Sequence, residues 1–432
     1  MLNFKSLSVV LSLLLMGSIS LCAQDKVVYE DRIFVDHLRT VQFGPAGFQF
    51  YFPLISLEDQ GQLMLSFDDL EAGVKDYTYT VIHCDRDWTP STLNKLEYID
   101  GFEEDDIQQF DFSFNTLTNY THYELLVPNR NMQLTKSGNY LLVIYEDEAE
   151  KIPVITRRFV VVDRRVGISA RLSRPAEVSK IRTHQEVDFF VDFQQLNVRN
   201  PMLELRASVI QNRRWDNAIY NIEPRMVRGT EAVFDYQGKV VFPAGNEFRF
   251  IDLRSLRAPQ SDIDQLRVVD DTYVEGSLRP LTSRANNTHL AYGDLNGGFA
   301  IENFDQRTAE LSGEYVDLLI TYQVPGKYEG QALYLVGGFT DWQLKPEFRM
   351  KYNPAISAYV GRVQLKQGYY NYFLATVPEH APADKPIIPS TELTEGNYDD
   401  TENDYLILIY YRPFGTRYDQ VVGAYQFNSI QN

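Results

Sequence analysis

The chain has 432 residues, a formal net charge of -18 at pH 7, 28 tyrosines and 26 phenylalanines. The acidic charge is concentrated in residues 25–150, where 24 Asp and Glu face 8 Lys and Arg, whereas residues 151–300 carry 18 against 22. Nucleic-acid binding needs a concentrated positive surface, so this distribution argues against that class. It favours a partner whose basic surface is attracted to the N-terminal part.

The first 23 residues have the pattern of a secretory signal. Lys5 supplies a positive charge, residues 7–16 are predominantly apolar, and Ala23 ends a zone suited to cleavage. The apolar run is too short to span a bilayer, so we expect export and removal of the segment. Acylation of Cys22 is the alternative, although Leu21 stands where a lipoprotein signal has a small residue. No later stretch reaches about 18 consecutive apolar residues, so no membrane helix is expected.

If Cys22 leaves with the signal, Cys84 is the one remaining cysteine and no intrachain disulfide can form. Stability must then come from buried apolar surface, and a chain of this length is long enough for two to four domains.

Period-two alternation with frequent turns predicts an all-β fold of tandem immunoglobulin-like or early-set β-sandwich domains with little helix. The alternation restarts near Val166, and Pro175 would interrupt a central strand there. "YVDLLITYQVP" opens a third region of strands. We therefore expect a signal (1–23), an acidic N-terminal sandwich (24–164), a middle sandwich with a turn-rich connection (165–312) and a C-terminal early-set-like sandwich (313–432).

No motif with the spacing of a catalytic or metal site is found. The six histidines form no paired ligand set, and phosphate-binding, dinucleotide-binding and nucleophile-elbow motifs are absent. In "VIHCDRDW", His83 and Cys84 point to opposite faces of a strand, which favours a buried cysteine followed by a solvated acidic turn. "NYDDTENDY" has Tyr405 where a calcium loop needs glycine, which favours a solvated acidic loop. We expect neither cofactor nor metal, and a protein that is not an enzyme.

The stretch "LYLVGGFTDWQ", followed by "VQLKQGYYNYFLATV", resembles the early-set domains found beside glycogen and starch enzymes. A glycan platform in that family needs further aromatic rings, and Trp342 is the only tryptophan of this region. Three roles for Trp342 stay open: core packing, a protein contact, or glycan stacking. The alternative function is accordingly an exported glycan-binding or glycan-processing protein.

A second resemblance covers essentially the whole mature chain. The segments "YTVIHCDRDWTPSTLNKLEYIDGF", "FDFSFNTLTNYTHYELLVPN", "SGNYLLVIYED" and above all "YYRPFGTRYDQVVG" resemble the type IX secretion system plug protein family. The resemblance implies a non-enzymatic periplasmic subunit, peripherally associated with the outer membrane. Such a subunit is a monomer within a heteromeric complex and blocks the periplasmic mouth of a giant outer-membrane β-barrel translocon. It implies no nucleic acid and no small-molecule substrate.

The most specific of these segments is rich in residue types that dominate protein interfaces. The candidate partner-binding residues are Tyr410, Tyr411, Arg412, Phe414, Arg417, Tyr418 and, by the separate argument above, Trp342. The structural alternative is that Tyr410 or Tyr411 faces the core by alternation, that Pro413 ends the strand, and that the arginines hold the fold together.

Overall fold

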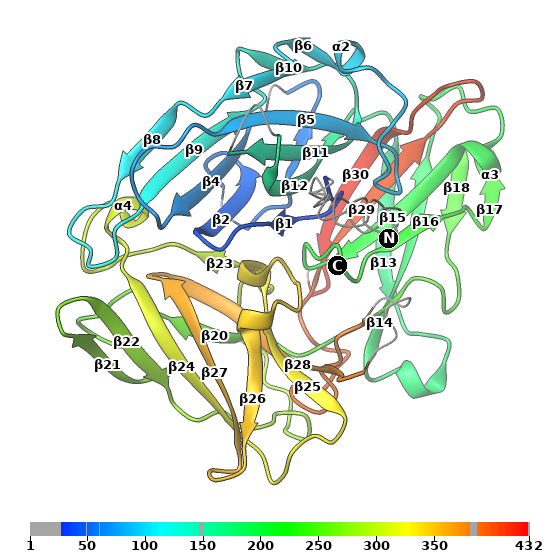
Figure 1. Cartoon of the computed structure of the whole chain (residues 1–432). Helices are drawn as coiled ribbons and strands as arrows, with labels where there is room; N and C mark the ends of the chain where they lie inside the picture. The colour runs from blue at the N-terminus through cyan, green and yellow to red at the C-terminus, as the bar shows by residue number, and fades with distance from the viewer. Residues whose placement is uncertain (1–26, 49, 60, 147–150, 381–386, 431–432) are drawn as a thin grey trace, which may run out of the picture.

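The structure is a computed structural model that describes residues 27–48, 50–59, 61–146, 151–380 and 387–430 (Figure 1). The expected signal, with Cys22, lies outside these residues. Within the described part, no helix is long and apolar enough to cross a membrane. Packed, mostly antiparallel sheets dominate the chain, which confirms the predicted all-β sandwich class.

A first sandwich is built from the N-terminal part of the chain. Its elements are β1 (Arg32–Ile33), β2 (Leu38–Pro45), β3 (Leu54–Ser56), β4 (Leu63–Asp69), β5 (Thr78–Cys84), α2 (Lys95–Tyr98), β6 (Ile99–Gly101), β7 (Glu104–Asp106), β8 (Gln109–Phe112), β9 (Thr121–Val127), β10 (Met132–Leu134), β11 (Gly138–Tyr145) and β12 (Pro153–Val162). One sheet has the order β1-β12-β11-β5-β7 with β3 beside β12, the other has the order β2-β4-β9-β8, and β10 pairs with β6. In β4, Leu63, Leu65 and Phe67 alternate into the core between the sheets, as a half-buried strand requires.

A second sandwich combines the middle of the chain with its end. Its elements are β13 (Gly167–Ser173), η1 (Val178–Lys180), β14 (His184–Asp192), α3 (Pro201–Glu204), β15 (Leu205–Gln211), β16 (Ile219–Ile222), β17 (Met226–Arg228), β18 (Glu231–Phe234), β19 (Val241–Pro243), β29 (Asp404–Tyr411) and β30 (Gln420–Asn428). The two sheets have the orders β13-β14-β18-β17, with β19 beside β14, and β16-β15-β29-β30.

The third sandwich encloses its core within one nine-stranded sheet of order β20-β28-β25-β26-β27-β24-β22-β21, with β23 beside β28. Its elements are β20 (Arg249–Asp252), β21 (Ile263–Val269), β22 (Tyr273–Leu278), β23 (Phe299–Ala300), α4 (Ala309–Ser312), β24 (Tyr315–Gln323), β25 (Gln331–Val336), η2 (Gly338–Thr340), η3 (Pro346–Phe348), β26 (Arg349–Asn353), β27 (Ala358–Lys366) and β28 (Tyr369–Pro378).

The strand pairing departs from the expected boundary between residues 312 and 313. β29 and β30 were expected in the third unit, but β29 pairs with β15 of the second sandwich. β20 and β22 were expected in the middle unit, but they pair with β28 and β24 of the third. For β29 the reason is that the strand is apolar on both faces and therefore needs cover on both.

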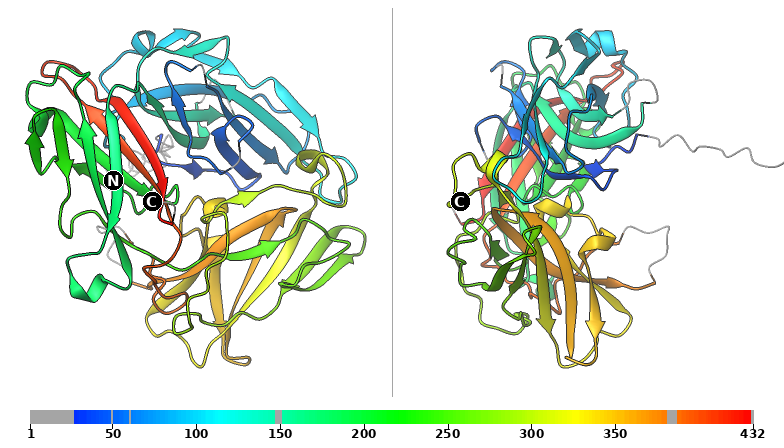
Figure 2. Two further views of the ribbon diagram at one scale, coloured as in Figure 1. Left: turned by 180° about the vertical axis from the view of Figure 1, so that it is seen from behind. Right: turned by 60° about the vertical axis from the view of Figure 1, so that its left-hand side comes forward.

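The two faces of β29 contact two different cores. Ile407 and Ile409 face the core of the second sandwich, whereas Leu406 and Leu408 pack with Val160 of β12 in the first sandwich. The first sandwich lies above the third in Figure 1, and the second lies beside both; Figure 2 shows the same arrangement from behind. The end of the chain thus locks the first two sandwiches together.

Candidate partner-binding site

The β29–β30 hairpin carries most of the candidate partner-binding residues, but its two tyrosines are buried. Tyr410 packs between the first and second sandwiches, and its hydroxyl donates to Oδ1 of Asn139 at 3.0 Å. Tyr411 packs on the opposite face, in the core of the second sandwich, and donates to the carbonyl of Asn197 at 2.9 Å. These two side chains therefore have a structural role.

Arg412 ties the hairpin to the turn after β5 in the first sandwich. Its Nη1 lies 3.1 Å from Oδ2 of Asp85 and 3.4 Å from Oδ2 of Asp419. Asp419 is buried, and its Oδ1 also accepts a hydrogen bond from Nη1 of Arg86 at 2.8 Å. Burial raises the pKa of Asp85, which the guanidinium of Arg412 opposes. Arg412, Asp85, Asp419 and Arg86 thus form a partly buried ion network across the junction of the first and second sandwiches.

Arg417 and Tyr418 extend the same junction. Arg417 pairs with Glu97 of α2, and the ring of Tyr418 meets the ring of His83 edge to face with centroids 5.3 Å apart. Burial lowers the pKa of His83 to about 4, so this histidine is neutral at pH 7. Its Nδ1 lies 2.9 Å from Oγ of Ser91. Arg417 and Tyr418 therefore contact the first sandwich within the chain.

Phe414, at the tip of the hairpin, is 93% exposed. Two other exposed apolar side chains lie on the segments that the hairpin connection contacts: Leu96 on α2, beside the Arg417–Glu97 pair, and Leu203 on α3. The amide of Arg412 donates to the carbonyl of Glu204, next to Leu203, at 2.9 Å. We call Phe414, Leu96 and Leu203 the tip patch.

Trp342 follows η2 in the third sandwich and is 9% exposed. Its ring packs with Phe248 and Phe373 at centroid distances of 6.0 and 6.1 Å, and the guanidinium carbon of Arg214 lies 4.9 Å from its ring centroid. Gly297 has φ of +79°, and a Cβ there would overlap the tryptophan ring. Trp342 therefore belongs to a packed cluster, and it presents no exposed ring for stacking.

A buried ion pair joins the first and third sandwiches. Nζ of Lys366 lies 2.6 Å from Oδ2 of Asp68, and both side chains are fully buried. Nδ1 of His122 lies 2.6 Å from Oδ1 of Asp68, and the hydroxyl of Tyr315 donates to Oδ2 at 2.6 Å. Burial alone would raise the pKa of Asp68, but Lys366 and His122 outweigh it and lower the pKa.

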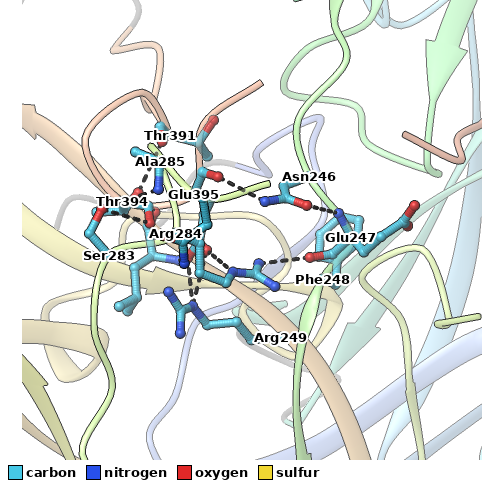
Figure 3. Close-up of polar contacts among 12 residues, drawn as sticks. Asn246, Glu247, Phe248, Arg249, Ser283, Arg284, Ala285, Thr391, Thr394 and Glu395 are labelled. Atoms are coloured by element: carbon cyan, nitrogen blue, oxygen red, sulfur yellow. Dashed lines mark hydrogen bonds and ion pairs between the residues drawn. The ribbon is translucent and has the colours of Figure 1, made fainter. Parts of the chain in front are cut away.

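A second buried carboxylate anchors the segment between β28 and β29 (Figure 3). Glu395 accepts from Nε of Arg249 at 2.9 Å and from Nε of Arg284 at 2.8 Å, and the amide of Leu374 donates to it at 2.9 Å. Burial acts to raise the pKa of Glu395, but the two guanidinium groups lower it. This cluster fixes the segment that leads to β29 to the third sandwich.

One group of side chains in the described part has ligand atoms close enough to hold a cation. The ligand atoms of His37, Glu71 and Glu146 lie within 4.8 Å of one another. Nζ of Lys75 lies 2.6 Å from Glu71 and 3.1 Å from Glu146. The ammonium group already supplies the positive charge, so the cluster is explained as a network of ion pairs.

Of the two predictions for "VIHCDRDW", the buried cysteine is confirmed and the solvated acidic turn is not. Cys84 is fully buried, and burial raises its pKa to about 12, so it is an unreactive thiol. The acidic turn is not simply solvated, because Asp85 binds Arg412. The sequence does not indicate Asp68, Lys366 or Glu395, because no local pattern marks an ion pair between residues more than a hundred positions apart.

A protein-family model described as "Type 9 secretion system plug protein 1st domain" matches residues 38–163, which lie in the first sandwich. The chain is also similar to a hypothetical protein from Parabacteroides merdae ATCC 43184, whose crystal structure was determined at 2.30 Å. The identity is 30%, the TM-score is 0.87, and the match covers 93% of this chain and 100% of that chain.

A further likeness, to native alpha-2-macroglobulin from Escherichia coli spanning domains NIE-MG1, has 13% identity and a TM-score of 0.15 over 47% of this chain and 86% of that one. It is too weak to carry an argument. No curated protein matches the chain. The family match covers the first sandwich, and through it the chain belongs to the type IX secretion system plug protein family, which links it to type IX secretion.

Proposed function

We propose that the protein is a non-enzymatic periplasmic plug subunit, which binds the periplasmic mouth of a giant outer-membrane β-barrel translocon and closes its pore. The observation that carries the proposal is that the sandwich matched by the family model is joined to both other sandwiches by buried apolar and ionic contacts. An open protein-conducting pore would leak solutes, and an obstruction that closes it must resist deformation.

Three ionic junctions between sandwiches support this rigidity. Asp68–Lys366 joins the first sandwich to the third, and Asp85–Arg412 joins the first to the second. Arg157 on β12 also lies 3.1 Å from Asp341 of the third sandwich, with both side chains buried. Breaking the Asp68–Lys366 or the Arg157–Asp341 pair would leave a poorly solvated charge, so the first and third sandwiches resist separation.

Of the candidate partner-binding residues, Phe414 is the one most exposed, and the tip patch is the surface that we assign to the translocon. Exposed apolar side chains are suited to a protein contact, and aromatic residues are frequent among those that dominate binding energy. Arg412 and Arg417 then act by holding the patch in place. Release would follow if another subunit stabilised a translocon state that binds the plug weakly.

Affinity purification of the tagged full chain from detergent-solubilised envelopes tests the proposal. A large outer-membrane barrel protein should be recovered in a stable complex under gentle conditions. Recovery of the tagged chain without any such barrel would contradict the plug role.

The glycan alternative gains no support from Trp342. Stacking on a sugar needs an exposed ring, and this ring is enclosed by Phe248, Phe373 and Arg214. We therefore propose no second function.

A further inference from the structure

The outer margin of the first sandwich ends in two short edge strands. β7 is the last strand of one sheet and pairs with β5, while β8 is the last strand of the other sheet and pairs with β9. Both lie along the upper left margin in Figure 1, away from the second sandwich. No further strand among the described residues covers either of them.

The backbone of β8 offers hydrogen-bonding groups along this margin. The amide of Ser113 donates to the carbonyl of Tyr120 at 2.9 Å, which continues the β8–β9 ladder. Residues of an antiparallel strand alternate between bonding to the neighbour and pointing away from it. The peptide groups of Phe110 and Phe112 therefore point away from β9, as a template for another strand.

Aromatic side chains flank these free peptide groups. Phe110 packs against the core of the first sandwich and is only partly buried, and the ring of Phe112 lies 5.9 Å from it, edge to face. Phe112 is 55% exposed, and Phe102, just before β7, is 61% exposed. The apolar core is thus incompletely covered where β8 ends the sheet.

The same margin carries uncompensated negative charge. Residues 96–129 contain eight Asp and Glu and no Lys or Arg. Glu104 is paired with Lys95 and Lys151, but Glu103 and Asp111 are exposed and form no ion pair with a described residue. On β8, Asp111 lies on the face opposite to Phe110 and Phe112.

A comparison strand shows that this composition is not shared by every sheet edge of the chain. β21 ends the sheet of the third sandwich and is also exposed. It places the cation Arg267 at its centre and the acid Asp264 near its start. Arg267 is paired with Glu275, so the centre of β21 offers a cationic segment no uncompensated negative charge, whereas β8 offers Asp111.

We propose that β8 docks an extended, basic segment of a partner protein by β-strand addition. The segment alternates apolar residues with Lys or Arg. Its apolar side chains extend the core beside Phe110 and Phe112, and its cations face Asp111, while the exposed Glu103 adds to the negative potential of the margin. This inference stands apart from the plug role, since it concerns another surface than the tip patch.

A labelled peptide of alternating Lys and Val, added to the full mature chain, tests the inference. Fluorescence anisotropy should show binding that weakens as salt is added, and hydrogen–deuterium exchange should show protection of residues 107–113. Exchanging Glu103→Lys and Asp111→Lys together should weaken binding by about tenfold at low salt. Asp111→Asn, which keeps the shape of the side chain, should give an intermediate loss.

Asp264→Lys on β21 is the control for a single charge reversal on another exposed edge strand, and it should leave binding unchanged. A version of the peptide with Glu in place of Lys should not bind. The proposal is overturned if the Glu peptide binds as well, if the reversed variant binds like wild type, or if no protection appears at 107–113.

Discussion

Nζ of Lys366 lies 2.6 Å from Oδ2 of Asp68, and neither side chain is exposed to solvent. The two residues are 298 positions apart and belong to the third and first sandwiches. Burial lowers the pKa of Lys366, and the carboxylate of Asp68 opposes this effect. Loss of either side chain would leave the other charge buried without its counter-ion. The junction between the first and third sandwiches should therefore be sensitive to single substitutions.

Lys366→Met should strongly destabilise the protein. The change leaves the Asp68 carboxylate in a buried site with His122 as its one close cationic partner. We expect a loss of about 3–5 kcal/mol in the free energy of unfolding, measured by urea denaturation followed by circular dichroism.

The double variant Lys366→Met with Asp68→Leu is the control for that measurement. Removing both charges avoids the unpaired carboxylate, so it should recover much of the lost stability. A double variant as unstable as the single one would show that packing, and not the charge, governs the junction.

Arg412→Ala should lower the melting temperature. Its guanidinium is the closest cation to Asp85 and a second partner for the buried Asp419. We expect a loss of about 1–3 kcal/mol, because charged hydrogen bonds at a partly buried site are removed. Arg267→Ala, which removes an arginine from an exposed pair with Glu275, should change stability far less. Equal small effects of the two substitutions would argue against a structural role for Arg412.

Phe414→Ser should separate binding from folding. The ring is 93% exposed, so its removal should leave the melting temperature nearly unchanged. Co-purification of the translocon should fall by about tenfold or more if the ring is a dominant contact. Ile356→Ser, at another exposed apolar position, serves as the control and should preserve co-purification. Undiminished recovery with Phe414→Ser would remove the tip patch from the proposed interface.

Acid should destabilise the junction through His83. Its pKa is lowered from about 6.5 in the unfolded chain to about 4 in the folded one, because burial disfavours the charged ring. The folded state therefore excludes a proton that the unfolded state binds. Above pH about 6.5, His83 is neutral in both states and costs the folded protein no stability. As the pH falls from about 6.5 toward 4, protonation of His83 in the unfolded chain lowers the free energy of unfolding by about 3 kcal/mol.

His83→Gln should flatten this part of the profile of unfolding free energy against pH, although the protein is less stable at pH 7. The exposed His380→Gln should keep the wild-type profile. An unchanged slope in His83→Gln between pH 6.5 and 4 would show that other groups cause the acid sensitivity.

The sequence predicts the sandwich class because alternation within a strand, as in β4, reports directly on a local core. It fails at the boundary between the second and third sandwiches, because the partner of β29 is chosen by long-range packing and not by its neighbours in the chain. "DYLILIYY" does contain a signal, since both of its faces are apolar and such a strand needs cover on two sides. The pairing with β15 cannot be derived from that signal alone.

For the candidate site too, the sequence predicts the features that depend on local alternation but not those that depend on distant partners. Alternation along the strand predicts that at least one of Tyr410 and Tyr411 is buried. Both are buried because one face of β29 packs in the second sandwich and the other packs against the first. Phe414 follows Pro413 beyond the strand end, so its exposure agrees with the sequence expectation of an end to β29. The roles of Arg412 and Arg417 depend on Asp85 and Glu97, whose proximity only the folded chain reveals.

Ion conductance through the purified translocon in a planar bilayer tests the central claim most directly. Adding the mature chain to the periplasmic side should convert open channels to a closed state, and Phe414→Ser should require a higher concentration for the same effect. Open channels whose conductance is unchanged by a saturating amount of the folded wild-type chain would contradict the plug role.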